Sequence, residues 1–298
     1  MRRVVLIVNP LASGVTDERV AAVERELAAS GVVETVRTER RGHAMELVRV
    51  ASRAADALVV YSGDGGFNEA LNGLERDIPI GFVPGGRSNV LPQALGLPRH
   101  AIPAAAVVAR ALAGGKTRRI SVGRVNGRRF GFSAGLGFDA ELVRRVEERG
   151  RSSAGERAGD FAFAAVAARF LAERRMRFPP SLEIEGVGRA AFAFVANCDP
   201  YSYFRRLPLR VAPQARFELG LDLVAPVSPT ARAWPRLLAY AVLGRGQTNA
   251  ADVLYRHDAD RIEIRCGRPM PMQADGEDLG DVEAATLACE RGAVSVLV

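Results

Sequence analysis

Lysine is almost absent from this chain of 298 residues, in which Lys116 is the only lysine among 41 basic residues. A phosphate-binding P-loop of the GxxxxGK[ST] type ends on a lysine, but Lys116 follows Gly114 and Gly115, where a helical pattern stops. No GxGxxG follows the first apolar run either. P-loop nucleoside triphosphatases and dinucleotide dehydrogenases are therefore disfavoured.

Cysteine and long apolar runs are also scarce. Three scattered cysteines are too few for a disulfide framework or a CxxC metal site, and their odd number is typical of a reducing compartment. No uninterrupted apolar run approaches the ~18 residues of a membrane span. The first run, Val4–Val8, is too short for the core of a signal peptide. We therefore expect a cytoplasmic protein.

Acidic residues, 34 in number, are outnumbered by basic ones, and the formal net charge is +7. A basic surface favours an acidic partner such as a nucleotide or an anionic membrane face. Because arginine in place of lysine can follow from genome composition alone, we expect no nucleic-acid partner. The three histidines form no HxxxH or HExxH pattern and no Gly-x-Ser-x-Gly elbow is present, so zinc catalysis and an α/β-hydrolase have little support.

The first 120 residues alternate short apolar strands with amphipathic helices, which is typical of an α/β domain with an open, largely parallel sheet. Strands are predicted at Val4–Val8, Val32–Val36, Ala57–Tyr61 and Ile78–Val83. Helices are predicted from Asp17, which we expect to be the cap, and at Ala44–Ala54, Asn68–Leu74, Ser88–Leu95 and Ala101–Ala113.

From residue 121 onward the pattern is β-rich. A hairpin turn is predicted at Asn126-Gly127, and two helices lie within Ala158–Arg175 and Thr230–Leu243. Four short strands are predicted near the end, at Arg261–Arg265, Met270–Gln273, Ala284–Ala288 and Val294–Leu297. We expect an α/β nucleotide-binding domain at 1–120 and a β-rich domain at 121–298, whose last strand could return to the first domain.

Three glycine-rich loops follow strands of the first domain, at Asn9–Gly14, Ser62–Gly66 and Pro84–Asn89. In an open α/β sheet, loops at the carboxyl ends of strands converge on one crevice. Glycine permits close approach of the backbone, and N–H groups at a helix N-terminus attract phosphate. The loops therefore predict a single phosphate-binding site.

Further motifs stand in a fixed order around these loops: Thr38 with Gly42-His43-Ala44, Phe67-Asn68-Glu69, Asn126-Gly127, Gly135–Ala140 and Gln273–Glu277. With the three loops, their order and spacing resemble the diacylglycerol kinase and sphingosine kinase superfamily over nearly the whole chain, and bacterial lipid kinases in particular. The resemblance implies an α/β nucleotide-binding domain followed by a β-rich lipid-binding domain, with the active site in the cleft between them.

The resemblance also implies ATP and Mg²⁺ as cofactors and assigns the site residues. The family's Gly-Gly-Asp-Gly loop holds the nucleotide phosphates. On this chain the nucleotide-binding residues become Asn9, Ser13, Gly14, Thr38, Gly63, Asp64, Gly65, Gly66, Asn68, Gly85, Gly86, Ser88 and Asn89. The late Asp-Gly-Glu looks like the catalytic motif, with Asp275 as the base that takes the lipid hydroxyl proton and Glu277 beside it. Taken alone, Asp275-Gly276 is equally typical of a hairpin turn.

Several positions depart from the family pattern. Gly66 stands where the family has Thr, and Arg87 and Val90 replace Thr and Asp in its Gly-Thr-x-Asn-Asp, so that a hydroxyl and a carboxylate are missing from the nucleotide site. Val15 replaces a basic residue, for which we expect Arg87 to compensate. Leu219 stands where some bacterial members have a structural metal ligand, so the metal ligands stay unassigned.

We expect an ATP-dependent kinase that phosphorylates a hydroxyl of a membrane lipid, with diacylglycerol, converted to phosphatidic acid, as the favoured acceptor. One alternative is a soluble-acceptor kinase of the NAD kinase type, which shares the Gly-Gly-Asp-Gly loop. Another is a nucleotide- or lipid-binding module with impaired catalysis.

The expected partners are the membrane lipid substrate and an anionic membrane surface at the inner face of the membrane, and a homo-oligomer is compatible with the sequence. The segment Thr230–Gln247 combines Trp234 and leucines with arginines, a composition suited to a headgroup layer but also to a helix packed on the sheet.

Overall fold

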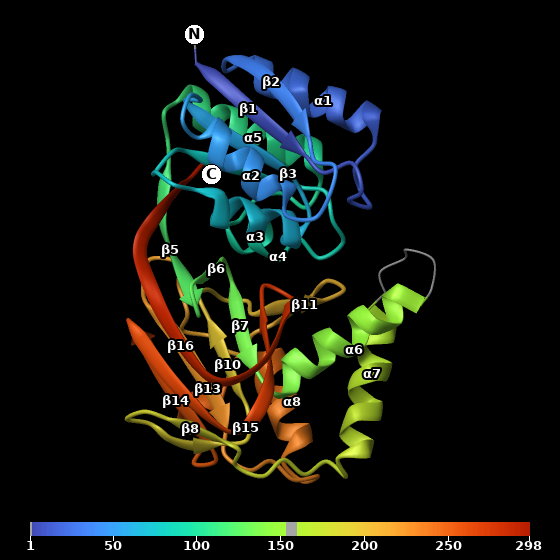
Figure 1. Ribbon diagram of the computed structural model, residues 1–298, viewed down its shortest axis with the longest axis vertical. Coiled ribbons are helices and arrows are strands. Elements are labelled where there is room, and N and C mark those ends of the chain that lie inside the picture. Colours follow the sequence, from blue (N-terminus) through green and yellow to red (C-terminus); the bar gives the residue numbers. More distant parts are fainter. Residues whose placement is uncertain (1, 153–159) are drawn as a thin grey trace. The chain divides into compact units, whose positions relative to one another are not determined.

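The computed structural model describes residues 2–152 and 160–298 (Figure 1). The chain divides into two compact units. The first comprises the chain up to Val122 together with Glu290–Val298, and the second comprises Gly123–Cys289. Two strands, β5 (Arg118–Val125) and β16 (Glu277–Val296), each run from one unit into the other. The sequence analysis placed this boundary between residues 120 and 121.

The first unit contains a parallel sheet in the order β4-β3-β1-β2. Its strands are β1 (Arg3–Val8), β2 (Val32–Arg37), β3 (Ala57–Ser62) and β4 (Ile80–Pro84). Every residue of β3 and β4 is buried, as expected for parallel strands that are covered on both faces. The end of β16 joins the edge of this sheet, where Val296 pairs in parallel with Ile80.

Helices cover this sheet in two packed pairs, α1 with α5 and α2 with α3 (Figure 1). The helices of the unit are α1 (Asp17–Ala28), α2 (His43–Ala51), α3 (Asp64–Gly73), α4 (Val90–Ala94) and α5 (Ala101–Ala113). The prediction that Asp17 caps α1 is wrong, because the hydroxyl of Thr16 accepts from the N–H of Arg19 and makes Thr16 the cap.

The strand order of the first unit reverses between β1 and β3. The chain leaves β1 for β2 on one side, whereas β3 leads to β4 on the other side. At such a topological switch point the loops after the two strands diverge and leave a crevice at the carboxyl ends. The loops that follow β1 and β3 are two of the three predicted glycine-rich loops.

The second unit contains an antiparallel sheet in the order β14-β13-β10-β7-β15-β16, with β8 added to β15 and β9 to β8. Its strands besides β5 and β16 are β6 (Arg128–Phe130), β7 (Ser133–Leu136), β8 (Leu182–Ile184), β9 (Gly188–Ala190), β10 (Ala193–Ala196), β13 (Leu221–Pro226), β14 (Val253–Ala259) and β15 (Arg261–Ala274). A separate hairpin consists of β11 (Ser202–Phe204) and β12 (Leu207–Leu209), and η1 (Gln247–Asn249) is a short 3₁₀ helix.

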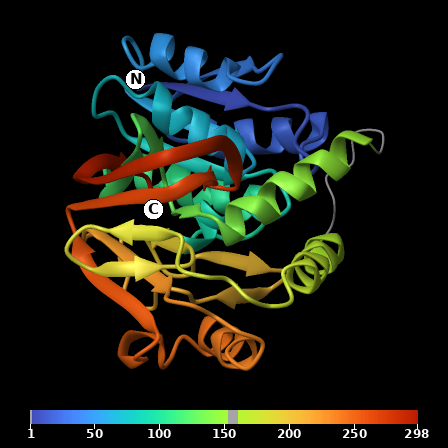
Figure 2. The ribbon, with the colours of Figure 1, turned by 60° about the horizontal axis from the view of Figure 1, so that its bottom comes forward.

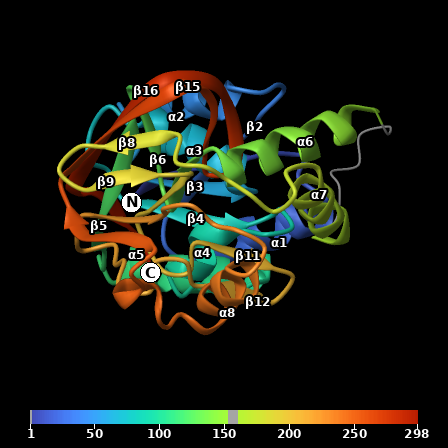
Figure 3. The same ribbon diagram turned by 90° about the horizontal axis from the view of Figure 1, so that it is seen from below.

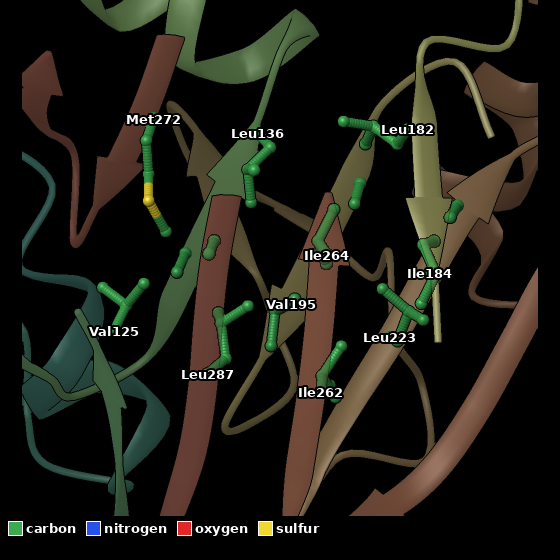
Figure 4. Packing of buried hydrophobic residues seen from close by; sticks show 14 of the residues in the cluster. Val125, Leu136, Leu182, Ile184, Val195, Leu223, Ile262, Ile264, Met272 and Leu287 are labelled. Carbon is green, nitrogen blue, oxygen red and sulfur yellow. The ribbon is translucent and has the colours of Figure 1, made fainter. Parts of the chain in front are cut away.

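Apolar side chains from these strands form the core of the second unit. Figure 4 shows Leu136, Val195, Leu223, Ile264 and Leu287, which come from five different strands and gather in one buried cluster. Each of them is at most 1% exposed. Burial on one face of an antiparallel sheet fixes its register, because a slip by one residue would turn the apolar set toward water.

The last part of the chain folds into two long strands rather than the four short ones that were predicted. β15 has 14 residues and β16 has 20. Their pairing shifts register between Arg265 and Met270 and again between Pro271 and Gln273. Such bulges interrupt the alternation of apolar and polar residues within a strand. The sequence pattern therefore predicted two short strands where the structure has one long strand.

Three helices are present in the described part of the second unit, whereas two were predicted. α7 (Asp160–Glu173) and α8 (Trp234–Leu243) lie within the predicted ranges. The sequence analysis missed α6 (Phe138–Ser152), which packs against α7 (Figure 2). Its sequence is too polar for a clear apolar period, and ion pairs such as that between Arg145 and Glu141, one turn apart, support it.

Among the residues that the structure describes, no helix combines the length and the apolar character needed to cross a membrane.

Candidate functional site

The three glycine-rich loops of the first unit are joined to one another by backbone hydrogen bonds. The N–H of Gly14 donates to the carbonyl of Gly85 over 2.7 Å, and the N–H of Gly85 donates to that of Ser62 over 2.7 Å. The N–H of Asn9 donates to the carbonyl of Tyr61 over 3.0 Å. The loops after β1, β3 and β4 therefore form one connected surface at the switch point.

Glycine is required where these loops touch. A Cβ atom on Gly14 would lie 2.9 Å from the carbonyl oxygen of Gly85, and one on Gly86 would lie 2.8 Å from the Cα of Gly63. The opposing atoms belong to the backbone and cannot turn aside. A side chain at Gly14 or Gly86 would therefore push two loops apart.

The helix after β3 begins at Asp64, so the prediction that it starts at Asn68 is wrong. Gly65 and Gly66 are thus not loop residues but lie in the first turn of α3. The N-cap, Gly63, has no side chain to satisfy the first N–H groups of the helix. Such an end carries a partial positive charge and directs N–H groups outward, and both features suit a phosphate.

Ser62 and Gly66 occupy one shared space below this helix end. A Cβ atom on Gly66 would lie 2.1 Å from Oγ of Ser62. That oxygen is buried and, among the described residues, has no hydrogen-bond partner. Position 66 therefore has no room for the threonine of the family pattern, because the hydroxymethyl group of Ser62 fills that space.

The third loop is held by Asn89, which adopts a left-handed conformation with a φ of 47°. Its Oδ1 accepts from the N–H of Gly86 over 2.8 Å, and its Nδ2 donates to the carbonyl of the same residue over 2.7 Å. Ser88 is exposed, and its carbonyl accepts from the side-chain amide of Gln93. α4 begins only at Val90, two residues later than predicted.

The remaining predicted nucleotide residues differ in accessibility. Ser13 is exposed, whereas Thr38 is 7% exposed and continues the β2–β1 pairing through an N–H bond to the carbonyl of Val8 over 2.9 Å. Asn68 has no exposed surface and accepts from the amide of Asn72. The structure thus places Asn68 inside α3 and not on the surface of the crevice.

Sequence reasoning missed the role of Glu69. One of its carboxylate oxygens accepts from the N–H of Gly42 over 2.8 Å, and the other accepts from the N–H of Ala44 over 3.1 Å. Glu69 thereby caps the N-terminus of α2 from α3. Only the tertiary contact between α2 and α3 identifies this role.

A depression of about 330 Å³ lies beside the loops of the first unit. It is lined by Gly14, Pro84 and Gly86 together with Arg19, Arg99, His100, Ala101, Ile102 and Pro103. The guanidinium of Arg19 donates to the carbonyl of Gly14 over 2.8 Å, and the hydroxyl of Tyr61 donates to the same oxygen over 3.0 Å. Burial raises the pKa of Tyr61, so the phenol keeps its proton and remains a donor.

Arg19 therefore places a positive charge beside the Gly14 loop. Its position in the sequence gave no sign of this, because Arg19 reads as an exposed residue of an amphipathic helix. Compensation by Arg87, which is exposed, stays a prediction.

In the second unit, Asp275 and Gly276 form the turn between β15 and β16. Both have positive φ, 49° and 77°, and Ala274 pairs with Glu277 across them. The hairpin reading of this dipeptide is confirmed. The side chain of Asp275 nevertheless points inward and is only 4% exposed.

Three backbone N–H groups bind this carboxylate. Oδ2 accepts from Gly131 over 2.6 Å, and Oδ1 accepts from Phe132 over 2.9 Å and from Ser133 over 3.1 Å. Bonds from N–H groups to an ionised oxygen are among the strong ones, so the carboxylate has a fixed orientation. Glu277 is 8% exposed and forms an ion pair with Arg128 over 2.5 Å.

A buried polar network lies behind this turn. The hydroxyl of Tyr201 donates to Oδ2 of Asp139 over 2.5 Å, and the amide of Gln273 donates to the same oxygen over 2.8 Å. Oε1 of Gln273 in turn accepts from the N–H of Gly276 over 2.9 Å. The network thus connects a side chain of α6 to the turn that carries Asp275.

Burial raises the pKa of Asp139, and the bonds from Tyr201 and Gln273 oppose this shift. Burial also raises the pKa of Tyr201 well above its usual value, so Tyr201 is the permanent donor of the pair.

The predicted site residues therefore form two groups. The nucleotide group lies in the first unit, where hydrogen bonds connect its three loops, and Asp275 and Glu277 lie in the second unit.

Comparison with known proteins identifies a family for the first part of the chain. Residues 3–125 match the family model of the diacylglycerol kinase catalytic domain. A curated relative, the diacylglycerol kinase of Bacillus subtilis strain 168, is 27% identical over 289 residues, which cover 93% of this chain and 90% of the relative. Residues 3–125 form a domain of the diacylglycerol kinase catalytic-domain family.

Solved structures show the same fold. A diacylglycerol kinase structure from Bacillus anthracis str. Sterne aligns with a TM-score of 0.74 at 19% identity and covers 99% of this chain and 96% of that chain. An NAD kinase from Archaeoglobus fulgidus, solved in complex with ATP, aligns with a TM-score of 0.52 at 15% identity, covering 99% of this chain and 93% of that one. The predicted fold, an α/β unit followed by a β-rich unit, is therefore confirmed.

The match to a kinase catalytic domain supports a phosphotransferase of the kinase class.

Proposed function

We propose that this protein transfers the γ-phosphoryl group of ATP to a hydroxyl of a membrane lipid, with diacylglycerol as the acceptor. The observation that carries the proposal is the crevice of three interlocked glycine loops around the uncapped N-terminus of α3. The depression beside it, with Arg19 and Arg99, adds positive charge for a polyphosphate.

Each group of residues has a distinct part in the proposed reaction. The loops of the first unit bind and orient the phosphates. Asp275 accepts the proton of the acceptor hydroxyl, whose oxygen forms a bond to the γ-phosphorus while the bond from that phosphorus to the bridging oxygen of ADP breaks. Glu277 lies at the start of β16, where Arg128 pairs with its carboxylate. The three N–H donors keep the carboxylate of Asp275 in one orientation.

Mg²⁺ would enter such a site together with ATP. The described residues contain no group of three or more histidine, cysteine or carboxylate side chains that could hold a metal ion. Mg²⁺ in kinases is bound chiefly by substrate phosphates, waters and one or two carboxylates, which this chain can supply. Asp64, in the first turn of α3, is the carboxylate nearest in sequence to the phosphate loop, and the metal would supply charge neutralisation of the phosphates.

The test is ADP release from Mg·ATP by the purified protein over mixed micelles that contain diacylglycerol, monoacylglycerol, ceramide or sphingosine, with NAD as a soluble acceptor in parallel. We expect lipid-dependent ADP release. Asp275→Asn should lower turnover by about 10²- to 10⁴-fold, the usual contribution of a general base, while the Kd for ATP changes by no more than a few fold.

Asn126→Ala is the matched control, because Asn126 occupies the same position of an equivalent hairpin turn. Unchanged turnover in Asp275→Asn would remove Asp275 from the mechanism. ADP release with NAD alone would indicate a soluble-acceptor kinase, and ATP binding without turnover on any acceptor would indicate an impaired module.

A further inference from the structure

Helix α8 of the second unit is apolar, yet it is not covered. Its sequence, WPRLLAYAVL, contains one charged residue, and none of its ten residues, all of them described, is buried. Leu238 is 63% exposed and Leu243 is 64% exposed. An apolar helix of a globular protein is normally buried in the core. The exposed apolar surface of α8 therefore indicates a site that binds a partner.

The apolar residues of one side of α8 reach the surface. Pro235, Leu238, Ala239 and Val242 follow the spacing i, i+3, i+4, i+7 of a single helical face, and Leu243 continues it. Pro235, Leu238 and Leu243 are exposed, and Ala239 and Val242 are half-buried. We call this set the α8 ridge. Arg236 is the one charged residue of the helix and pairs with Asp252.

The other side of α8 is anchored to the protein. The indole N–H of Trp234 donates to the carbonyl of Met176 over 3.1 Å, and its ring lies 5.0 Å from that of Phe138 and 5.4 Å from that of Phe178. Near the end of the helix, the N–H of Arg210 donates to the carbonyl of Ala241 over 2.5 Å. The ridge is therefore held in a fixed position.

The β11–β12 hairpin continues the surface, because β12 packs against α8 (Figure 3). Leu207 at the start of β12 is 43% exposed, and Arg205 and Arg206 are exposed at the turn before it. Three of the exposed large apolar side chains of the second unit, Leu207, Leu238 and Leu243, thus belong to two elements in contact.

The charge around this surface is strongly positive. Residues 201–250 contain seven arginines, namely Arg205, Arg206, Arg210, Arg216, Arg232, Arg236 and Arg245. They contain only two acidic residues, Glu218 and Asp222, and Asp222 is fully buried. Asp199 and Asp252, just outside this segment, form ion pairs with Arg210 and Arg236, so the excess of positive charge rests on the other five arginines. A ridge of leucines bordered by arginines matches the layers of an anionic bilayer, in which acyl chains lie below negative headgroups.

We propose that the α8 ridge and the tip of the β11–β12 hairpin dock on the surface of an anionic lipid bilayer. The choice of a bilayer rests in part on the proposed function, because a kinase for a membrane lipid must reach its acceptor there. Charge complementarity is the independent argument, because the arginines match anionic headgroups and the leucines match acyl chains. A protein partner would instead have to present an apolar groove with an acidic border.

Flotation with vesicles tests the docking without any catalysis. The full-length protein is mixed with vesicles of phosphatidylcholine alone or with about one-third phosphatidylglycerol, in the absence of ATP and diacylglycerol. We expect binding to the anionic vesicles only, with an affinity that falls as salt is raised. Leu238→Gln/Leu243→Gln should lower the partition coefficient at least about tenfold, which is the loss expected for two apolar side chains.

Two further variants make the result specific. Val50→Gln removes an apolar side chain that is 68% exposed on α2 of the first unit, and it should leave the partition coefficient within twofold. Arg205→Gln/Arg206→Gln should weaken binding to anionic vesicles by about five- to twentyfold, because each basic residue near the surface contributes a severalfold gain. Equal binding by the wild type and the Leu238→Gln/Leu243→Gln variant would overturn the proposal.

Activity on a short-chain, water-soluble diacylglycerol separates this proposal from the proposed function. The Leu238→Gln/Leu243→Gln variant should keep wild-type turnover on that acceptor and lose it on acceptor embedded in vesicles. Vesicle binding without phosphorylation of any lipid would support docking and contradict the proposed function. A ridge variant that changes the molecular mass in solution and leaves vesicle binding intact would show an interface between copies of the chain and overturn the docking proposal.

Discussion

The glycine loops of the first unit and the Asp275 turn of the second unit are built in opposite ways. In the loops, backbone touches backbone: the N–H of Gly14 donates to the carbonyl of Gly85, and a Cβ on Gly86 would lie 2.8 Å from the Cα of Gly63. At the turn, a side chain is the organiser, because the carboxylate of Asp275 binds three backbone N–H groups.

This difference determines which substitutions each region tolerates. The loops fail when a side chain is added, since the space between them is already filled by backbone atoms. The turn fails when a side chain is removed, since buried N–H groups then lose their acceptor. The following experiments test this contrast, beginning with the largest expected effect.

Asp275→Ala should lower the free energy of unfolding by at least about 3 kcal/mol, because three buried N–H donors lose their partner at roughly 1 to 3 kcal/mol each. Asn126→Ala changes the equivalent residue of the other Asx-Gly turn, which has the same left-handed conformation, with a φ of 45°. The side chain of Asn126 accepts from the N–H of Thr286 over 3.1 Å and donates to the carbonyl of Ala284 over 3.4 Å, both in exposed positions. Its loss should cost about 1 kcal/mol or less beyond the shared backbone effect.

Denaturant unfolding of both variants measures the difference. Equal losses would mean that the carboxylate of Asp275 does not organise its turn.

Gly66→Thr should destabilise the first unit by roughly 1 to 3 kcal/mol, since its Cβ would lie 2.1 Å from Oγ of Ser62 and the site is already full. Adding Ser62→Gly should recover most of this loss, because it removes the obstructing hydroxymethyl group. Thermal unfolding of the two single variants and the double variant measures the coupling between the positions. Additive effects would show that Ser62 and Gly66 do not share one space.

Tyr201→Phe should cost about 1 to 3 kcal/mol at neutral pH, because Asp139 loses a hydrogen bond to its buried carboxylate. The effect should depend on pH. Burial already raises the pKa of Asp139, and removal of a bond that favours the anion raises it further. When the pKa of Asp139 is higher in the folded state than in the unfolded state, where it is about 4, protonation of Asp139 stabilises the fold at low pH. This stabilisation is lost as the pH rises through the pKa of Asp139 in the folded state.

The stability difference between wild type and Tyr201→Phe should therefore grow from acid toward neutral pH. Urea unfolding at a series of pH values measures it, and a difference that is constant with pH would mean that Asp139 does not titrate in this network.

Arg19→Gln should give the smallest effect, a roughly two- to fivefold weaker Kd for ATP, because Arg19 is exposed and its charge is screened by solvent. Arg25→Gln makes the same charge change near the other end of α1 and should leave the Kd unchanged within error. Calorimetric titration of ATP into both variants provides the comparison. Equal changes in the Kd for ATP in the two variants would show that Arg19 acts through the net charge of the protein and not through its contact with Gly14.

The sequence predicted the elements of the first unit better than those of the second. The apolar runs of β1 and β3 and the helix at Ala101–Ala113 are confirmed, because buried parallel strands and amphipathic helices each leave a regular pattern. In the second unit, bulges hid the continuity of β15 and β16, and the many charges of α6 hid its period.

The candidate site shows the same limit. The glycine loops could be predicted because a backbone that must approach another backbone leaves glycine in the sequence. The roles of Arg19 and Glu69 could not be predicted, because each residue lies on a helix among other charged residues. Only the tertiary contacts of the two side chains distinguish them from their neighbours.

By itself, the sequence determined the fold class, the three glycine-rich loops and the hairpin at Asp275-Gly276, because local conformation and apolar patterning specify these. Only the tertiary structure decided that Ser62 fills the space at Gly66, that Asp275 faces inward onto three N–H groups, and that the apolar helix α8 is exposed. These are contacts between segments distant in sequence, and burial and hydrogen-bond partners across such distances exist only once the chain has folded.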